Sequence, residues 1–282
     1  MNMRLPVLGC AVLLALAIRA QQPPELTAAN GALERLAHAT TDVQRDSASQ
    51  VLDRLLRSLL DRDDAMTMDL TGLRMSRVDA PDGRFRLLTW NVPREDGTHH
   101  YEGLLLVQEK RRRVLHALQD RTRTIEQPEQ RSLGADMWYG ALYYQVLPTR
   151  KGGRTWYTLL GWKGHSAVET RKVIDVLVFK GAVPQFGAPL FGEGRVRRQR
   201  RVFAFGYQSS MSLKWDEAGR RIVMDHLSPT KPEFEGQGAF MGPDLSYDAY
   251  VWDKDHWRFE RDVDVRQMDL DKPWNRPPRE QR

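Results

Sequence analysis

Short segments rich in β-branched and aromatic residues follow one another from residue 73 to residue 265, and this pattern constrains the fold more than any other feature. Turn residues such as Pro81-Asp82-Gly83 and Lys151-Gly152-Gly153 separate neighbouring segments, as in β-hairpins. The predicted strands cover residues 73–79, 84–92, 100–108, 113–120, 138–147, 155–162, 173–180, 201–207, 211–215, 221–226, 247–252 and 257–265. The pattern predicts a mainly β protein with an antiparallel meander, and it leaves a barrel, a sandwich and a propeller-like arrangement open.

The residues before the strands have a helical pattern instead. Leu52, Leu56 and Leu59 recur at helical spacing, and Ser47 with Gln50 three residues later is typical of a capping box at a helix start. A weaker pattern predicts a further helix over residues 25–39. Because the helices precede the strands and do not alternate with them, a parallel α/β architecture is disfavoured.

The first twenty residues predict export. Arg4 gives a positive start, residues 5–18 are apolar, and Ala20 is a small residue suited to cleavage. The alternatives are an amino-terminal membrane anchor, for which the apolar stretch is short, and lipoprotein processing at Cys10, which lies inside that stretch. The predicted location is the periplasm or the medium. Since Cys10 is the single cysteine, cleavage after Ala20 leaves a mature chain without disulfides or thiol chemistry.

The predicted organisation therefore has four parts. They are a signal peptide over residues 1–20, a helical segment over 21–65, an antiparallel β domain over 66–270 and a flexible tail over 271–282. After the leader, no stretch is apolar enough to span a bilayer, so the mature chain is predicted to be soluble, with no transmembrane span.

Charge gives a weak indication of partners. Loss of Arg4 and Arg19 with the leader lowers the formal net charge from +6 to +4. Basic residues cluster over 110–113 and 195–201, where they suit either an anionic polysaccharide, a lipid surface or nucleic acid, or solvated strand ends and loops. The second interpretation is the simpler one. Export argues against nucleic acid, so the predicted partner is an envelope polysaccharide or protein.

Several motifs carry a family resemblance. They are Phe-Arg-Leu-Leu-Thr-Trp-Asn-Val-Pro (85–93), Trp-Tyr-Gly-Ala-Leu-Tyr-Tyr (138–144), Tyr-Thr-Leu-Leu-Gly-Trp-Lys-Gly (157–164), Met-Asp-His-Leu-Ser-Pro (224–229) and Gly-Pro-Asp-Leu-Ser-Tyr-Asp-Ala-Tyr (242–250). In these motifs the chain resembles a family of uncharacterised exported proteins from Bacteroidetes-type bacteria. The resemblance implies export and a soluble domain. It brings no activity and no catalytic residue with it.

Polar residues near the carboxyl end form the candidate ligand site. Pro243 stiffens the approach to a group of hydrogen-bonding side chains just ahead of a strand. The candidate ligand-binding residues are Asp225, His226, Asp244, Tyr247 and Asp248. The alternative is a loop held by side-chain to backbone hydrogen bonds of the Asx type.

Other motifs are less specific. Residues 164–168 contain four of the five positions of a nucleophile elbow, but the following run predicts a strand where the elbow needs a helix, so Ser166 is predicted to lie in a polar hairpin loop. His165, Glu169, Asp225 and His226 lack the local spacing of a metal site, so no metal is predicted, and the cofactor is unknown. The eight Trp and eight Tyr suit glycan stacking if exposed, and core packing for most of them.

Three functions follow from these observations. The preferred one is an exported binding or interaction module for a cell-envelope component or glycan. The second is an envelope hydrolase that uses clustered carboxylates and His226, which leaves open whether the protein is an enzyme. The third is a structural envelope protein without a small-molecule site.

Overall fold

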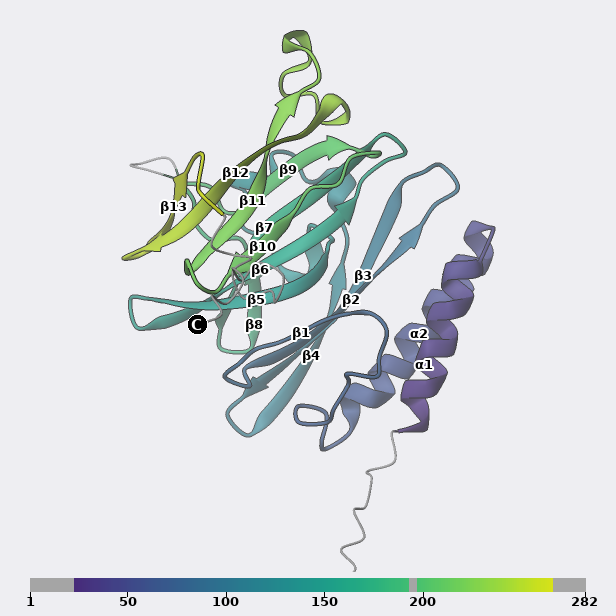
Figure 1. The fold of residues 1–282 in the computed structure, drawn as a ribbon. Coiled ribbons are helices and arrows are strands. Elements are labelled where there is room, and N and C mark those ends of the chain that lie inside the picture. The colour runs from purple at the N-terminus through teal and green to yellow at the C-terminus, as the bar shows by residue number, and fades with distance from the viewer. Residues whose placement is uncertain (1–22, 193–196, 266–282) are drawn as a thin grey trace, which may run out of the picture.

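The computed structural model describes residues 23–192 and 197–265, which form four stacked layers (Figure 1). Two helices are the outermost layer, and three antiparallel sheets follow. The predicted signal peptide (residues 1–20) and the predicted tail (271–282) lie outside the described residues. Within the described ranges, no helix combines the length and the apolar composition that a membrane span requires.

Helices α1 (Pro24–His38) and α2 (Asp42–Asp61) form the predicted helical segment. The capping box of α2 consists of Thr41 and Gln44, so the predicted box at Ser47 and Gln50 is wrong, and Ser47 lies inside the helix. In both Thr41–Gln44 and Ser47–Gln50 the two residues are three positions apart, so spacing alone does not distinguish them. The first turn of α2 has no apolar stripe by which its start could be recognised, since its residues are exposed or half-buried.

In the described part of the chain, thirteen strands form three sheets, which confirms the predicted mainly β fold with antiparallel meander order. The first sheet contains β1 (Ser76–Asp79), β2 (Phe85–Pro93), β3 (His99–Glu109) and β4 (Arg112–Gln119). The second contains β5 (Leu142–Lys151), β6 (Arg154–Gly164), β7 (Glu169–Lys180), β8 (Val183–Phe186) and β9 (Arg201–Gly206). The third contains β10 (Leu213–Asp216), β11 (Arg221–Pro229), β12 (Met241–Asp253) and β13 (His256–Glu260). None of these sheets closes into a barrel.

The observed strands differ from the predicted ones at a few places. β8 was not predicted, because it is short and contains Pro184. The predicted strand over 138–147 begins only at Leu142, and Trp138 lies fully buried in the preceding loop. β13 ends at Glu260, so the last residues of the predicted strand 257–265 lie beyond it.

Alternating side chains of the strands fill three separate cores. In the first sheet, Leu88 of β2 and Leu104 of β3 pack against the helices, whereas their neighbours Leu87 and Leu105 pack against the second sheet. The third core lies between the second and third sheets. β7 contributes residues to the cores on both sides of the second sheet, which is therefore buried on both faces.

A buried ion pair joins the loop before β9 to the middle of the second sheet. Asp175 of β7 and Arg200 are both fully buried, and Oδ1 of Asp175 lies 3.1 Å from Nε of Arg200. The hydroxyl of Tyr143 donates to Oδ2 of Asp175 at 3.1 Å, and Nη1 of Arg200 donates to the carbonyl oxygen of Arg131 at 2.8 Å. The ion pair and these bonds offset part of the cost of burying both charges, while Nη2 of Arg200 is buried without a hydrogen-bond partner among the described residues.

Candidate functional site

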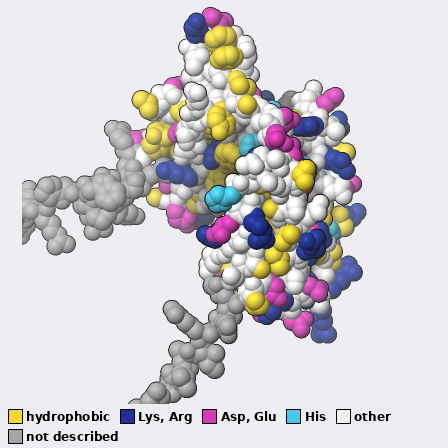
Figure 2. All heavy atoms as spheres, turned by 90° about the vertical axis from the view of Figure 1, so that its right-hand side faces the viewer, with side chains coloured by type: hydrophobic (Ala, Val, Ile, Leu, Met, Phe, Trp, Pro, Cys, Tyr) yellow, Lys and Arg dark blue, Asp and Glu magenta, His cyan; other side chains and the backbone are white. Residues whose placement is uncertain are grey.

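A cavity of about 930 Å³ opens where the β2–β3 turn meets the β6–β7 turn. The turns come together because hairpins of two stacked sheets end on the same side. They are in contact, since a Cβ placed on Gly97 would lie 2.9 Å from the Cβ of Ala167, and Gly97 also has a φ of +76° that favours glycine. Figure 2 shows charged side chains of both signs interspersed on the face that carries the helices, with His side chains among them.

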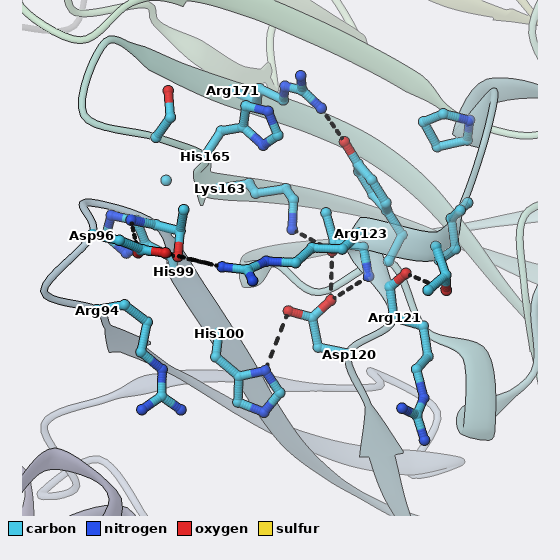
Figure 3. Close-up of a pocket in the computed structure, with 18 of the residues that line it drawn as sticks. Arg94, Asp96, His99, His100, Asp120, Arg121, Arg123, Lys163, His165 and Arg171 are labelled. Carbon is cyan, nitrogen blue, oxygen red and sulfur yellow. Dashed lines mark hydrogen bonds and ion pairs between the residues drawn. The ribbon is translucent and has the colours of Figure 1, made fainter. Parts of the chain in front are cut away.

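Most residues that line the cavity are polar or charged, and their charges are nearly balanced (Figure 3). It comes from the start of α2, the β2–β3 turn, the start of β3, the segment after β4 with the 3₁₀-helix η1 (Thr122–Thr124), and the β6–β7 hairpin. The basic side chains are Arg94, Arg121, Arg123, Lys163 and Arg171. The acidic ones are Asp42, Asp46, Asp96 and Asp120. Three imidazoles complete the set, those of His99, His100 and His165.

Asp120 organises the floor of the cavity. Its carboxylate accepts hydrogen bonds from the backbone N–H of Tyr101 at 3.0 Å and of Thr122 at 2.9 Å. The backbone N–H of Gly140 adds a longer contact of 3.4 Å. No larger residue fits at position 140, because a Cβ there would lie 2.3 Å from the Cβ of Tyr101 and 2.8 Å from Cγ of Asp120. The carboxylate thereby ties β3, η1 and the segment before β5 together.

Lys163 lies deep beside this carboxylate, and its side chain is 1% exposed. Its Nζ donates to the carbonyl oxygen of Gly140 at 2.6 Å and to Oγ1 of Thr122 at 2.8 Å. The ammonium also lies 4.3 Å from the ring centre of Tyr101 and 4.6 Å from that of Tyr139, which are favourable cation–π distances. Burial nevertheless lowers the pKa of Lys163 to about 7, while the charge of Asp120 acts to raise it.

Two imidazoles of the cavity are neutral at pH 7. Burial, together with the charge of Arg171, lowers the pKa of His165 to about 4. Burial and the charge of Lys163 also lower the pKa of His99. The Nδ1 of His99 accepts from the side-chain amide of Asn91 at 3.0 Å, so its Nε2 carries the ring hydrogen. A neutral imidazole offers one donor and one acceptor.

Most charged groups of the cavity are held in pairs. The pairs are Arg94 with Asp46 at 2.6 Å, Arg123 with Asp96 at 3.3 Å, and Arg171 with Glu169 at 2.6 Å. Figure 3 shows Arg123 reaching from η1 toward Asp96 in the β2–β3 turn. Each pair presents a hydrogen-bond donor beside an acceptor, which is the arrangement that a hydroxyl group can satisfy on both sides.

The residues proposed from the sequence lie elsewhere, on β11 and β12 of the third sheet. The structure brings His226 and Asp248 together, with Nδ1 of the ring 2.7 Å from Oδ2 of the carboxylate. Asp244 instead accepts from Ser228 at 2.6 Å, and the serine bonds lower its pKa to about 2. Asp225 accepts from a backbone N–H at 2.7 Å in front of β10.

Tyr247 is the strand partner of Asp225 and is half-buried. A register shift follows at His226, where residues 244–246 of β12 have no strand partner on β11. Two of the five residues thus form one hydrogen-bonded pair, and Asp244 is held by side-chain and backbone bonds of the Asx type. None of the five lines the cavity.

The structure also places Ser166 and the four residues considered for a metal site. Ser166 lies in the β6–β7 turn as predicted, and its Oγ accepts from the backbone N–H of Val168 and Glu169 at 3.3 and 3.2 Å. His165 comes within 4.0 Å of Glu169, but Asp225 and His226 lie on the third sheet. Among the described residues, no group of three His, Cys, Asp or Glu side chains is placed to hold a metal ion.

The arginine-rich segment before β9 is neither a free patch nor simply solvated. Arg200 is buried, and Arg198 and Arg201 both pair with Glu129. Arg195 lies outside the described residues. Most of the large aromatic side chains are core residues, as predicted. Among the described residues that line the cavity, Tyr139 is only 1% exposed and no Trp, Tyr or Phe offers a broad exposed ring for stacking.

The cavity residues were missed because each belongs to a short polar stretch that, by itself, is typical of a turn. The available signal was that His99-His100 lies at the start of the predicted strand 100–108, and that Gly164-His165-Ser166 closely follows the predicted strand 155–162. Only the stacking of the two sheets brings these stretches together.

Comparison of the chain with known protein families, with proteins of established function and with solved structures finds no match. The resemblance to an exported family of Bacteroidetes-type bacteria stays a prediction.

Proposed function

We propose that the protein is an exported binding module whose cavity takes an uncharged, hydroxyl-rich ligand, namely a glycan of the cell envelope. The observation that carries this proposal is the pairing of the charged groups. A site for an anion presents cations without counter-charges, whereas here Arg94, Arg123 and Arg171 each have a carboxylate partner. The two other basic side chains donate to uncharged oxygens, Lys163 to Gly140 and Thr122 and Arg121 to Gln119. A sugar hydroxyl donates and accepts at once, and such pairs serve both roles.

The neutral imidazoles support the same ligand class. His99 and His165 add donors and acceptors without adding charge at pH 7. The cavity volume lies at the upper end of the range of small-molecule sites, about 300–1,000 Å³. Since no exposed aromatic ring lines the described cavity, hydrogen bonds are proposed to supply most of the specificity.

The first test is binding of the purified protein to immobilised oligosaccharide ladders derived from starch, cellulose, chitin, β-1,3-glucan and alginate. The alginate ladder is anionic and the others are not. A neutral ladder is expected to bind, and calorimetry should give an affinity that changes by less than about threefold between low salt and about 500 mM NaCl. Binding to the alginate ladder alone, with a steep loss in salt, would contradict the proposal of an uncharged ligand.

Variants locate the site. Arg123→Gln removes a charge-assisted hydrogen-bond donor from the cavity and is expected to weaken binding by at least about tenfold. The matched control is Arg258→Gln on β13, whose guanidinium pairs with Asp253 and Glu260 far from the cavity lining. Equal affinities of the two variants would place the ligand outside the cavity.

The hydrogen bond between His226 and Asp248 favours one second candidate, the envelope hydrolase. A ring held at Nδ1 by a carboxylate leaves Nε2 to act as a general base. If the protein is a hydrolase, it should release shortened oligosaccharides from the ladders, and the variant His226→Ala should release none. If the protein is structural and has no ligand site, it should neither bind the ladders nor release oligosaccharides from them.

A further inference from the structure

A second cavity adjoins the first. It has a volume of about 380 Å³ and lies between α2, the first half of β3 and the end of β4. The two cavities share three lining residues, His100, Asp120 and Arg121, so that one wall belongs to both. The two cavities therefore adjoin at these three residues.

One face of α2 runs along both cavities. Asp46 lines the first, and Asp53 and Arg57 line the second. Spacings of seven and four residues place the three side chains on one stripe of the helix. Eleven residues of helix rise by about 16 Å, which is several times the width of a single sugar ring. The polar stripe therefore lies beside both cavities, which are together called the groove.

The chemistry of the second cavity repeats that of the first. Arg57 donates to Asp53 at 2.7 Å, again as a paired donor and acceptor. Burial raises the pKa of Glu102, and the charges of Asp53 and Asp46 raise it further. Asp53 and Glu102 both line the second cavity, and Asp46 lines the first. The alternation of acids with Arg57 and Arg121 keeps the second cavity close to neutral.

We infer that the ligand is a chain of several sugar units that lies along α2 and fills both cavities, an inference that rests on the proposed function. A single sugar would contact only one cavity and leave the paired groups of the other without a ligand. Charge balance along the whole groove suits a neutral chain whose hydroxyl groups repeat at regular intervals. The shared residues His100, Asp120 and Arg121 then lie beside the unit that crosses from one cavity to the other.

Chain length provides the test. On the ladder that binds, affinity measured by calorimetry is expected to increase from disaccharide to tetrasaccharide by at least about tenfold, because the longer chain gains contacts in the second cavity. Arg57→Gln is expected to remove this gain, so that the variant binds the tetrasaccharide no more tightly than the disaccharide. The matched control is Arg54→Gln, an exposed residue on the same helix that lines neither cavity and is expected to preserve the gain.

The outcomes separate the two proposals. Equal affinity for short and long chains, or a full length gain in Arg57→Gln, overturns the inference while the proposed function stands if Arg123→Gln still weakens binding. Absence of binding to every ladder, or a normal affinity of Arg123→Gln, overturns the proposed function itself.

Discussion

Asp175→Asn tests how far the fold depends on the buried ion pair at its centre. The change removes one charge and leaves the guanidinium of Arg200 buried, since both side chains are fully inaccessible to solvent. Loss of one partner of a buried pair costs about 3–5 kcal/mol. Arg200 keeps its bond to the carbonyl of Arg131, and the asparagine oxygen still accepts from Tyr143. We therefore expect the lower end of that range, about 3 kcal/mol.

The assay is equilibrium unfolding in urea, followed by tryptophan fluorescence. A domain of this kind has a free energy of unfolding of about 5–15 kcal/mol, so the variant is expected to fold but with a lower urea midpoint. The control is Asp253→Asn, whose side chain is 42% exposed in its pair with Arg258 and is expected to lose less than about 1 kcal/mol.

A double variant tests the interaction between Asp175 and Arg200 directly. Asp175→Asn combined with Arg200→Met removes both charges, so its loss of stability should be smaller than the sum of the two single losses. If Asp175→Asn alone costs no more than the exposed control, or if the two changes are additive, the ion pair does not stabilise the fold in the way the buried geometry implies.

Three further predictions concern the lysine, the glycine beside it and the helix cap. Because burial lowers the pKa of Lys163 to about 7, the unfolded chain binds up to one more proton than the folded chain between pH 7 and pH 10. The free energy of unfolding, measured relative to Lys163→Met, should therefore rise by up to about 1.4 kcal/mol per pH unit over this range. Parallel curves of unfolding free energy against pH for the two proteins would refute this. Gly164→Ala places a Cβ 2.6 Å from the His99 ring, so it should lower the free energy of unfolding in urea by about 1–3 kcal/mol and weaken glycan binding. An unchanged affinity would show that the His99 ring does not shape the site. Thr41→Ala should lower the free energy of unfolding by about 1 kcal/mol, and Ser47→Ala by much less. The reverse order would indicate that Ser47 caps the helix, as the sequence predicted.

Local pattern was sufficient for most of the helices and strands of this fold, but not for β8 or for the start of β5. The strands from Phe85–Pro93 to Arg112–Gln119 were predicted within a few residues, because side chains of β2 and β3 alternate between two cores and the β2–β3 turn contains Gly97 at positive φ. The division into three sheets was not predictable, since it depends on which neighbouring strands do not pair. The run before β5 illustrates the difficulty: Trp138 has strand-like neighbours, yet it is buried in a loop.

The site was harder to predict for a related reason. Residues on one hairpin, such as His226 and Asp248, could be grouped from the sequence, and they do form a hydrogen bond. His99, Asp120 and His165 are far apart in the chain and meet only because two sheets stack with their turns at the same end. Burial of Lys163 follows from the same stacking, and nothing in its local sequence distinguishes it from an exposed lysine.

Histidine resonances offer the most direct test of where the ligand binds. The chain has seven His, of which His99, His100 and His165 line the cavity and His226 lies on the third sheet. We predict that titration with the best-binding oligosaccharide shifts the imidazole carbon-bound proton signals of the three cavity residues and leaves that of His226 in place. A shift of the His226 signal, with the three others unmoved, would contradict the assignment of the cavity as the binding site.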